Sequence, residues 1–217
     1  YGPLPGYYKD GILLIKTRRN NITNNLVNDN KNVGIRLVEA TQNMIEGNNV
    51  TKNGLSGVIL ETMSQNNTLL RNNITVNQQG GVAIVNSEYA TVRENNIKEN
   101  QAGDGVFITT TPQTANKLNI LIENNQIVRN QGEGITVITS NFNKIIKNTI
   151  TDNSRNGVSV TNAKNNTIGS SPAGKNKIEA NLWNGIDLSD AETTAIINNE
   201  IRANILDGII VEGITGS

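Results

Sequence analysis

The 217-residue chain contains no cysteine and no histidine. Without cysteine it forms no disulfide bonds, and without either residue it offers no thiolate or imidazole ligand to a metal. Catalysis by a nucleophile–histidine pair is excluded as well, because no imidazole is present to act as the base. Any chemistry must therefore come from carboxylates, amines, guanidinium groups, amides and hydroxyls.

The chain also lacks a charge imbalance and long apolar runs. Its 19 basic residues equal its 19 acidic residues, so no basic excess suggests binding to nucleic acid. No apolar run is long enough to cross a membrane, and only 3% of the residues are aromatic. The chain starts at Tyr1 rather than methionine and shows no signal peptide, so we expect a processed piece of a secreted or cell-surface precursor.

Asparagine, in contrast, occurs 39 times, and much of it belongs to a repeated phrase of the form Asn-x-aliphatic-x-x-Asn. In six copies a glycine follows the second Asn after four residues; Gly34 and Gly105 follow theirs after nine and five. A fixed period of this length indicates a solenoid built from stacked rungs. The eight copies are Asn20-Ile22-Asn25, Asn48-Val50-Asn53, Asn72-Ile74-Asn77, Asn95-Ile97-Asn100, Asn125-Ile127-Asn130, Asn148-Ile150-Asn153, Asn176-Ile178-Asn181 and Asn199-Ile201-Asn204.

The glycines set the length of the rung. They are separated by 23, 23, 24, 24, 29, 23, 28 and 23 residues, which gives about nine rungs of ~23 residues with insertions at 109–117 and 169–175. The glycines are Gly11, Gly34, Gly57, Gly81, Gly105, Gly134, Gly157, Gly185 and Gly208. We expect residues 1–10 to form an N-terminal edge or cap and residues 11–217 to form the solenoid.

Each rung contains three segments in which apolar residues alternate with polar ones, a pattern typical of strands. One segment follows the glycine and one lies inside the Asn phrase. A third precedes the phrase, and its inward residues are expected to be Ile45, Leu69, Val92, Leu121, Ile145, Ile168 and Ile196. Three short strands per rung with one inward face predict an all-β fold, a three-sided parallel β-helix.

The Asn columns have two physical explanations. Asn tolerates left-handed backbone angles at the sharp turns between strands. Identical Asn side chains stacked rung over rung can also pass amide hydrogen bonds along the stack.

These repeats resemble the right-handed parallel β-helix repeats of the pectate lyase-like superfamily, in particular NosD-type repeats. The stretch from Asn166-Thr167-Ile168-Gly169 to Asn184-Gly185-Ile186 is similar to phrases of large bacterial surface β-helix proteins. The resemblance covers nearly the whole chain and implies the right-handed fold. It leaves the activity open, because such folds include lyases, epimerases, glycosidases, adhesins and scaffolds.

The outward positions after the glycines predict an apolar patch. Ile59, Ala83, Val85 and Phe107 would lie on neighbouring rungs and could form a groove for a partner or a sugar face. Alternatively, the N-terminal tyrosines Tyr1, Tyr7 and Tyr8 or the 109–117 loop cover this patch. Trp183 could stack on a sugar ring or could pack locally, and the 169–175 insertion is a candidate edge of a site.

Charged residues suggest two weaker candidate sites. Lys177 is expected over Glu200 and Glu179 over Arg202, either as cross-strand ion pairs or as a general base with a cation that binds a substrate carboxylate. Asp187 and Asp190 form the one tight carboxylate pair expected on an exposed face. The acids that precede glycines, Asp10, Asp104, Glu133 and Asp207, are interpreted as turn residues.

Two functions stay open at this point. The first is a non-catalytic extracellular scaffold or adhesin-like module that could bind a polysaccharide and stack end to end or continue in a larger protein, since parallel edges invite pairing. The second is a lyase, epimerase or hydrolase of acidic glycans that uses Glu179, Glu200, Arg202 and Lys177. We expect no cofactor, with calcium entering only under the enzymatic alternative. Copper is discounted because Met44 and Met63 are the only soft ligands.

Overall fold

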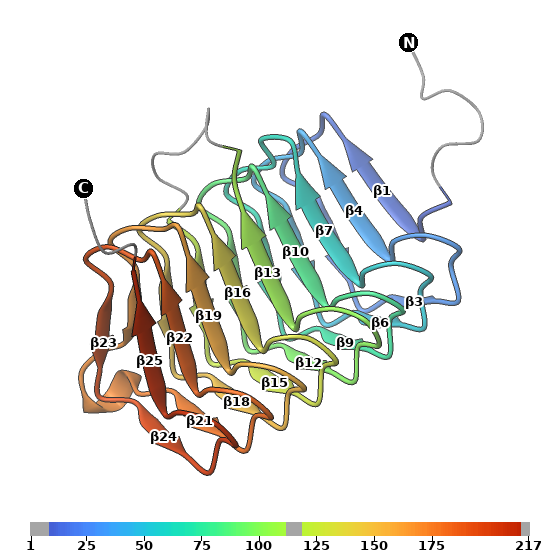
Figure 1. The fold of residues 1–217 in the computed structure, drawn as a ribbon. Helices are drawn as coiled ribbons and strands as arrows, with labels where there is room; N and C mark the ends of the chain where they lie inside the picture. Colours follow the sequence, from blue (N-terminus) through green and yellow to red (C-terminus); the bar gives the residue numbers. More distant parts are fainter. Residues whose placement is uncertain (1–8, 112–118, 214–217) are drawn as a thin grey trace.

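The computed structural model describes residues 9–111 and 119–213, which coil into a parallel β-solenoid (Figure 1). Within these residues the strands form three parallel sheets of nine, eight and eight strands, that is, eight complete rungs and one strand of a ninth. Sheet 1 contains β1 (Ile12–Ile15), β4 (Ile35–Val38), β7 (Val58–Glu61), β10 (Val82–Val85), β13 (Val106–Thr109), β16 (Ile135–Ile138), β19 (Val158–Thr161), β22 (Ile186–Ser189) and β25 (Ile209–Glu212).

The other two sheets use strands of three residues. Sheet 2 contains β2 (Asn21–Thr23), β5 (Met44–Glu46), β8 (Thr68–Leu70), β11 (Thr91–Arg93), β14 (Leu121–Glu123), β17 (Lys144–Ile146), β20 (Thr167–Gly169) and β23 (Ala195–Ile197). Sheet 3 contains β3 (Leu26–Asn28), β6 (Asn49–Thr51), β9 (Asn73–Thr75), β12 (Asn96–Lys98), β15 (Gln126–Val128), β18 (Thr149–Thr151), β21 (Lys177–Glu179) and β24 (Glu200–Arg202). The 169–175 insertion contains a short 3₁₀ helix, η2 (Pro172–Gly174), between sheets 2 and 3.

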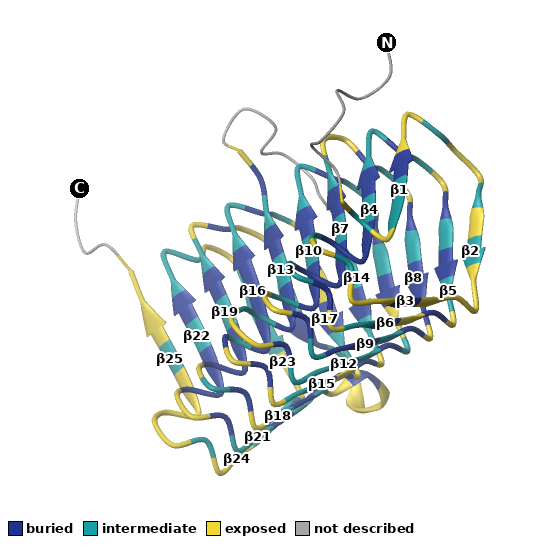
Figure 2. Ribbon diagram, turned by 90° about the vertical axis from the view of Figure 1, so that its right-hand side faces the viewer, coloured by how far each residue is buried: buried dark blue, intermediate teal, exposed yellow. Residues whose placement is uncertain are grey.

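The core is a column of aliphatic side chains inside the three sheets. The predicted inward residues after the glycines are buried in the middle rungs, and the last rung is largely exposed (Figure 2). One predicted inward residue is wrong: Ile122, not Leu121, occupies the sheet 2 column, because Val92 of β11 pairs with Ile122. The insertion before β14 changes the spacing in this rung, so the sequence pattern did not reveal the register of that strand.

Two Asn ladders run along the solenoid. At the corner between sheets 2 and 3, each Asn side-chain N–H donates to the Oδ1 atom of the next Asn at 2.8–3.1 Å; the members are Asn25, Asn48, Asn72, Asn95, Asn125, Asn148, Asn176 and Asn199. The corner between sheets 3 and 1 carries a second ladder with the same geometry: Asn30, Asn53, Asn77, Asn100, Asn130, Asn153, Asn181 and Asn204.

These ladders correct the first copy of the Asn phrase. In the first rung the copy that matches the others is Asn25-Val27-Asn30, because Asn25 stacks on Asn48 and Asn30 on Asn53. Gly34 then follows after four residues, as in the other regular rungs. The phrase Asn20-Ile22-Asn25 belongs to the preceding corner, where Asn20 donates to Asn43.

The left-handed backbone explanation for the ladder Asn residues is also wrong. None of the ladder Asn residues has a positive φ angle, and in most rungs the left-handed residue at these two corners is the one before the ladder Asn, such as Arg71, Glu94 and Asp152. The ladder Asn is selected instead by its amide. Asn125, for example, accepts from both the backbone and the side-chain N–H of Asn95 and donates to Val92 O and Asn148 Oδ1.

We predict that Asn125→Ala lowers the free energy of unfolding by about 2–4 kcal/mol, because the buried donors of Asn95 lose their acceptor. Chemical unfolding followed by circular dichroism measures the effect. Gln126→Ala, at an exposed neighbouring position, is the control and should stay within about 0.5 kcal/mol of the wild type. A loss for Asn125→Ala no larger than that of the control would show that the ladder contributes little to stability.

Candidate functional site

The predicted charged cluster lies on the outer face of sheet 3, at β21 and β24. The register places Lys177 beside Glu200 and Glu179 beside Arg202. Arg202 Nε lies 3.0 Å from Glu179, so this cross-strand pair is confirmed. Lys177 instead contacts Glu179 of its own strand at 2.6 Å, and Lys175 contacts Glu200 at 3.1 Å, because the insertion brings a second lysine to this rung.

The ion pairs disfavour acid–base catalysis by this cluster. The hydrogen bond from Lys177 lowers the pKa of Glu179, and the hydrogen bond from Lys175 lowers the pKa of Glu200. A general acid or base works best when its pKa lies near the working pH. The structure therefore assigns these side chains a surface ion-pair network, whose pairs each contribute little to stability.

The outer face of sheet 1 brings the predicted apolar patch together. Ile59, Ala83 and Phe107 are in register on β7, β10 and β13. With Val85 they line a hollow of about 440 Å³, which we call the Phe107 hollow. The polar residues that line it include Ser56, Gln79 and Asp104. Tyr1, Tyr7, Tyr8 and residues 112–117 of the loop that was expected to cover the patch lie outside the described residues.

The sequence reading missed a carboxyl pair beside this hollow. Asp104 and Glu133 occupy the same place on adjacent rungs, and the backbone N–H of Glu133 donates to Asp104 Oδ1 at 2.9 Å. The Glu133 side chain is 13% exposed, and its closest cation, Arg155, lies 3.9 Å away. Burial, followed by the hydrogen bond with Asp104, raises the pKa of Glu133 to about 7. The sequence did contain a signal for this pair, because acidic residues precede two successive strand-opening glycines.

Asp10 and Asp104, two of the acids that precede glycines, have the predicted role as turn residues. Asp10 Oδ1 accepts the backbone N–H of Val33, and Asn184 Oδ1 accepts that of Asp207. Asp104 makes the same kind of bond to Glu133. For Glu133 the structure shows a buried carboxyl next to another carboxyl, a setting that strongly perturbs proton affinity.

Trp183 lies on the same side of the solenoid as the pair. Its ring centroid is 5.4 Å from the guanidinium carbon of Arg155, and 44% of the residue is exposed. Arg155 thus contacts the aromatic ring and lies near Glu133. This cation–π contact explains the position of Trp183 without requiring a ligand.

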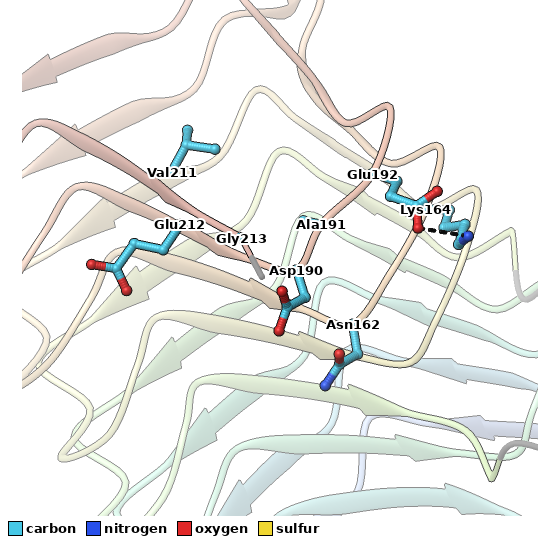
Figure 3. A pocket seen from close by; sticks show the side chains of 8 residues that line it. All are labelled: Asn162, Lys164, Asp190, Ala191, Glu192, Val211, Glu212 and Gly213. Atoms are coloured by element: carbon cyan, nitrogen blue, oxygen red, sulfur yellow. Dashed lines mark ion pairs between the residues drawn. The ribbon is translucent and has the colours of Figure 1, made fainter. Parts of the chain in front are cut away.

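The structure gives Asp187 and Asp190 different contacts. Asp187, on β22, accepts a hydrogen bond from Asn156 Nδ2 at 3.2 Å, and burial together with the charge of Glu212 raises its pKa. Asp190 lines a separate hollow of about 490 Å³ near the C-terminal rung (Figure 3). There its side chain lies beside Asn162, and Lys164 and Glu192 form an ion pair at 2.7 Å.

The 169–175 insertion also lies apart from the hollow of sheet 1. It connects sheets 2 and 3, where Gly174 O accepts the backbone N–H of Lys147. Gly169 has φ +84°, and a Cβ atom there would lie 2.0 Å from Ile197 O, so this position requires glycine. The expectation that this loop borders a site stays a prediction, and any such site differs from the Phe107 hollow.

The solved structures to which the chain is similar include two epimerases and a pectate lyase, by their titles. The chain is similar to the periplasmic alginate epimerase AlgG, with TM-score 0.65, 22% identity and coverage of 94% of this chain and 47% of that chain. It is also similar to the A-module of the Azotobacter vinelandii mannuronan C-5 epimerase AlgE6 (TM-score 0.60, 18% identity, 91% and 60% coverage) and to pectate lyase Pel9A (TM-score 0.51, 15% identity, 85% and 55% coverage). The chain thus spans about half of their lengths, and the similarity establishes the fold alone. No curated protein sequence matches it.

We predict that Glu133→Gln raises the unfolding temperature at pH 8 and that the gain disappears near pH 4.5. Between its ordinary pKa of 4.5 and about 7, the folded protein keeps a proton on Glu133 that the unfolded chain has released. The contribution of Glu133 to stability therefore falls as the pH rises through this window, and the neutral amide avoids that loss. Thermal unfolding at both pH values tests this, and an equal shift at both would contradict the raised pKa.

Two family descriptions match the sequence, each over more than half of the chain. Residues 7–118 match the right handed beta helix region, and residues 77–213 match the periplasmic copper-binding protein (NosD). The chain's residues do not fit a copper centre: it has no Cys or His, Met44 and Met63 lie on different rungs, and no group of three or more acidic residues that could hold a metal exists within 9–111 and 119–213. The chain belongs to the right-handed β-helix proteins and, by its C-terminal two-thirds, to the NosD family.

Proposed function

We propose that the chain is an extracytoplasmic β-helical scaffold that binds a glycan on the outer face of sheet 1. The observation that carries this proposal is the Phe107 hollow, in which stacked apolar side chains are bordered by polar ones. A pyranose ring has an apolar face and a polar edge, so it matches such a surface. The family description, which names a periplasmic protein, supports a location outside the cytoplasm. No helix in the described residues is long and apolar enough to span a membrane.

The repeat geometry favours an extended ligand. Neighbouring strands of sheet 1 are about 4.8 Å apart, and the outward residues along the solenoid change from apolar at Ile59, Ala83 and Phe107 to polar at Thr136 and Ser159. A polymer that lies along the solenoid axis would therefore contact several rungs at once. The structural neighbours named for alginate and pectate chemistry support a chain-like ligand of this kind.

A binding role is favoured over the enzymatic alternative, a lyase, epimerase or hydrolase of acidic glycans. That alternative uses Glu179, Glu200, Arg202 and Lys177, which are engaged with one another and with Lys175. Its calcium-dependent form would need several acids on adjacent rungs. The part of the chain that the structure describes offers no such group of three.

We predict that Phe107→Ala weakens oligosaccharide binding at least about tenfold, because the sugar ring would lose its contact with the aromatic ring. Isothermal titration calorimetry against a panel of neutral, acidic and amino oligosaccharides measures the effect. Glu179→Gln, on the outer face of sheet 3, is the matched control and should bind like the wild type. Binding that survives Phe107→Ala, or binding that Glu179→Gln abolishes, would place the glycan elsewhere.

Association of copies end to end belongs to the same proposal. Every step of both Asn ladders donates toward the C-terminal rung, so the stack offers acceptors at Asn25 and Asn30 and donors at Asn199 and Asn204. These ends are complementary to each other. We predict assemblies whose mass grows with concentration in light scattering, and that Asn204→Leu reduces them. A constant monomer mass at high concentration would contradict this prediction.

A further inference from the structure

A column of hydrogen bonds along the solenoid is interrupted at the Phe107 hollow. In this column, the residue before a strand-opening glycine donates its backbone N–H to the side chain of the equivalent residue on the preceding rung. The pairs with this bond, at 2.9–3.0 Å, are Val33 and Asp10, Glu133 and Asp104, Asn184 and Asn156, and Asp207 and Asn184. Within residues 9–111 and 119–213, the N–H groups of Ser56, Gly80, Asp104 and Asn156 have no such acceptor. The first three of these residues lie on consecutive rungs and line the hollow.

The interruption follows from the residue types in the column. Val33, which precedes Ser56 by one rung, is buried and has no side-chain oxygen. Gly80, which precedes Asp104 by one rung, has no side chain at all. The backbone N–H groups of Ser56 and Asp104 therefore find no acceptor on the rung before them. A backbone donor that the protein leaves unpaired is satisfied by water or by a ligand.

The missing side chain of Gly80 leaves a space with polar walls, which we call the Gly80 slot. A Cβ atom on Gly80 would have Asp104 O at 3.0 Å, Asp104 N at 3.7 Å and Ser56 Oγ at 3.8 Å as its nearest neighbours. On the rung of Asn156, the equivalent space holds the side chain whose oxygen accepts the next backbone N–H. A ligand oxygen in the Gly80 slot would therefore replace the acceptor that the column lacks.

The charges around the hollow disfavour an anionic ligand. In the described part of the chain, no basic side chain lines the hollow, whereas Asp104 does. Arg36 is in register with Ile59, but its guanidinium group lies 2.9 Å from Asp10 and 2.8 Å from Glu61. One cation thus stands between two carboxylates. A carboxylate on the ligand would meet Asp104 without a cation dedicated to it.

We propose that a hydroxyl group of a neutral glycan occupies the Gly80 slot while its sugar ring lies against Phe107. This inference rests on the proposed glycan-binding function and names the class of sugar. The hydroxyl oxygen accepts from the backbone N–H of Asp104, and its proton is donated to Ser56 Oγ. An ammonium group has donors only and cannot accept from Asp104, and a carboxylate has no proton to donate. A hydroxyl group matches both partners.

The first test compares oligosaccharides that differ only in charge. The pairs are β-1,4-linked hexamers of mannose and mannuronate, β-1,4-linked hexamers of glucose and glucuronate, and α-1,4-linked hexamers of galactose and galacturonate. In calorimetry, the neutral member of the tightest-binding pair should bind at least about tenfold more tightly than its acidic partner. Added sodium chloride should leave the neutral hexamer unaffected and strengthen binding of the acidic one, because salt screens the repulsion.

The second test fills the slot. Gly80→Asn supplies an amide oxygen, as Asn156 and Asn184 do on later rungs, and the φ angle of Gly80 is not positive. We expect binding of the neutral hexamer to weaken at least about tenfold. The unfolding temperature should stay the same or rise, because the Asp104 N–H gains an acceptor. Gln78→Asn, at an exposed position on the same rung, is the matched control and should bind like the wild type.

Hydrogen exchange provides a third test that needs no variant. In the wild-type protein, nuclear magnetic resonance should show slower exchange of the Asp104 backbone N–H when the neutral hexamer is bound, because that hydrogen bond protects it. This measurement decides the question even where circular dichroism shows that Gly80→Asn does not fold.

The outcomes separate the two proposals. Failure of all six hexamers to bind would overturn the glycan-binding function and this inference together. Three results would overturn the inference alone while Phe107→Ala still weakens binding. They are an acidic hexamer that binds as tightly as its neutral partner, a folded Gly80→Asn variant that binds like the wild type, and an exchange rate at Asp104 that the ligand leaves unchanged.

Discussion

The Asn side-chain amide that bridges adjacent rungs is the contact on which this fold depends. A turn between two short strands leaves backbone N–H groups without a strand partner, and those groups are buried here. Each interior ladder Asn satisfies such an N–H with its Oδ1 atom and returns two N–H donors to its neighbours, as Asn125 does. The ladder is therefore a chain of fully paired amides. This is why Asn recurs at the same corner in every rung.

This constraint separates the structural positions from those that are free for function. Inward aliphatic residues and corner amides are fixed by packing and hydrogen bonding, while the outward positions of each strand are not. The stack also makes neighbours of residues that lie 23 to 30 positions apart in sequence. Asp104 and Glu133 are an example: 29 residues separate them, yet the backbone of one donates to the side chain of the other. A solenoid thus assembles a polar cluster without a loop or a second domain.

The architecture was predictable from the sequence because period and alternation are properties of residue type alone. The glycine spacing, the three inward columns and the stacking of Asn all follow from them, and Phe107 was placed correctly beside Ala83. The predictions were wrong where the position or the partner of a residue depends on the neighbouring rung. The phrase Asn20-Ile22-Asn25 fits the pattern but lies one corner too early, and Leu121 was chosen over Ile122 because both are aliphatic. Lys177 turned to Glu179 because Lys175 competes for Glu200, a contact that register alone does not reveal.

The pair of Asp104 and Glu133 was not predicted for a related reason, and its position can be explained physically. In the column before the glycines, a short Asp or Asn side chain accepts the N–H of the next rung, as Asp10, Asn184 and Asp104 do. A structural role therefore explains Asp104, whose side chain also forms the hydrogen bond with the Glu133 carboxyl group. Glu133 is longer, is only 13% exposed and has its nearest cation at 3.9 Å, so its carboxyl group is poorly stabilised as an anion. Retaining an acid there lowers stability at neutral pH, and such unfavourable arrangements concentrate at functional sites. Glu133, the acid that departs from this rule, lies one rung beyond Asp104, which lines the hollow where we place the ligand.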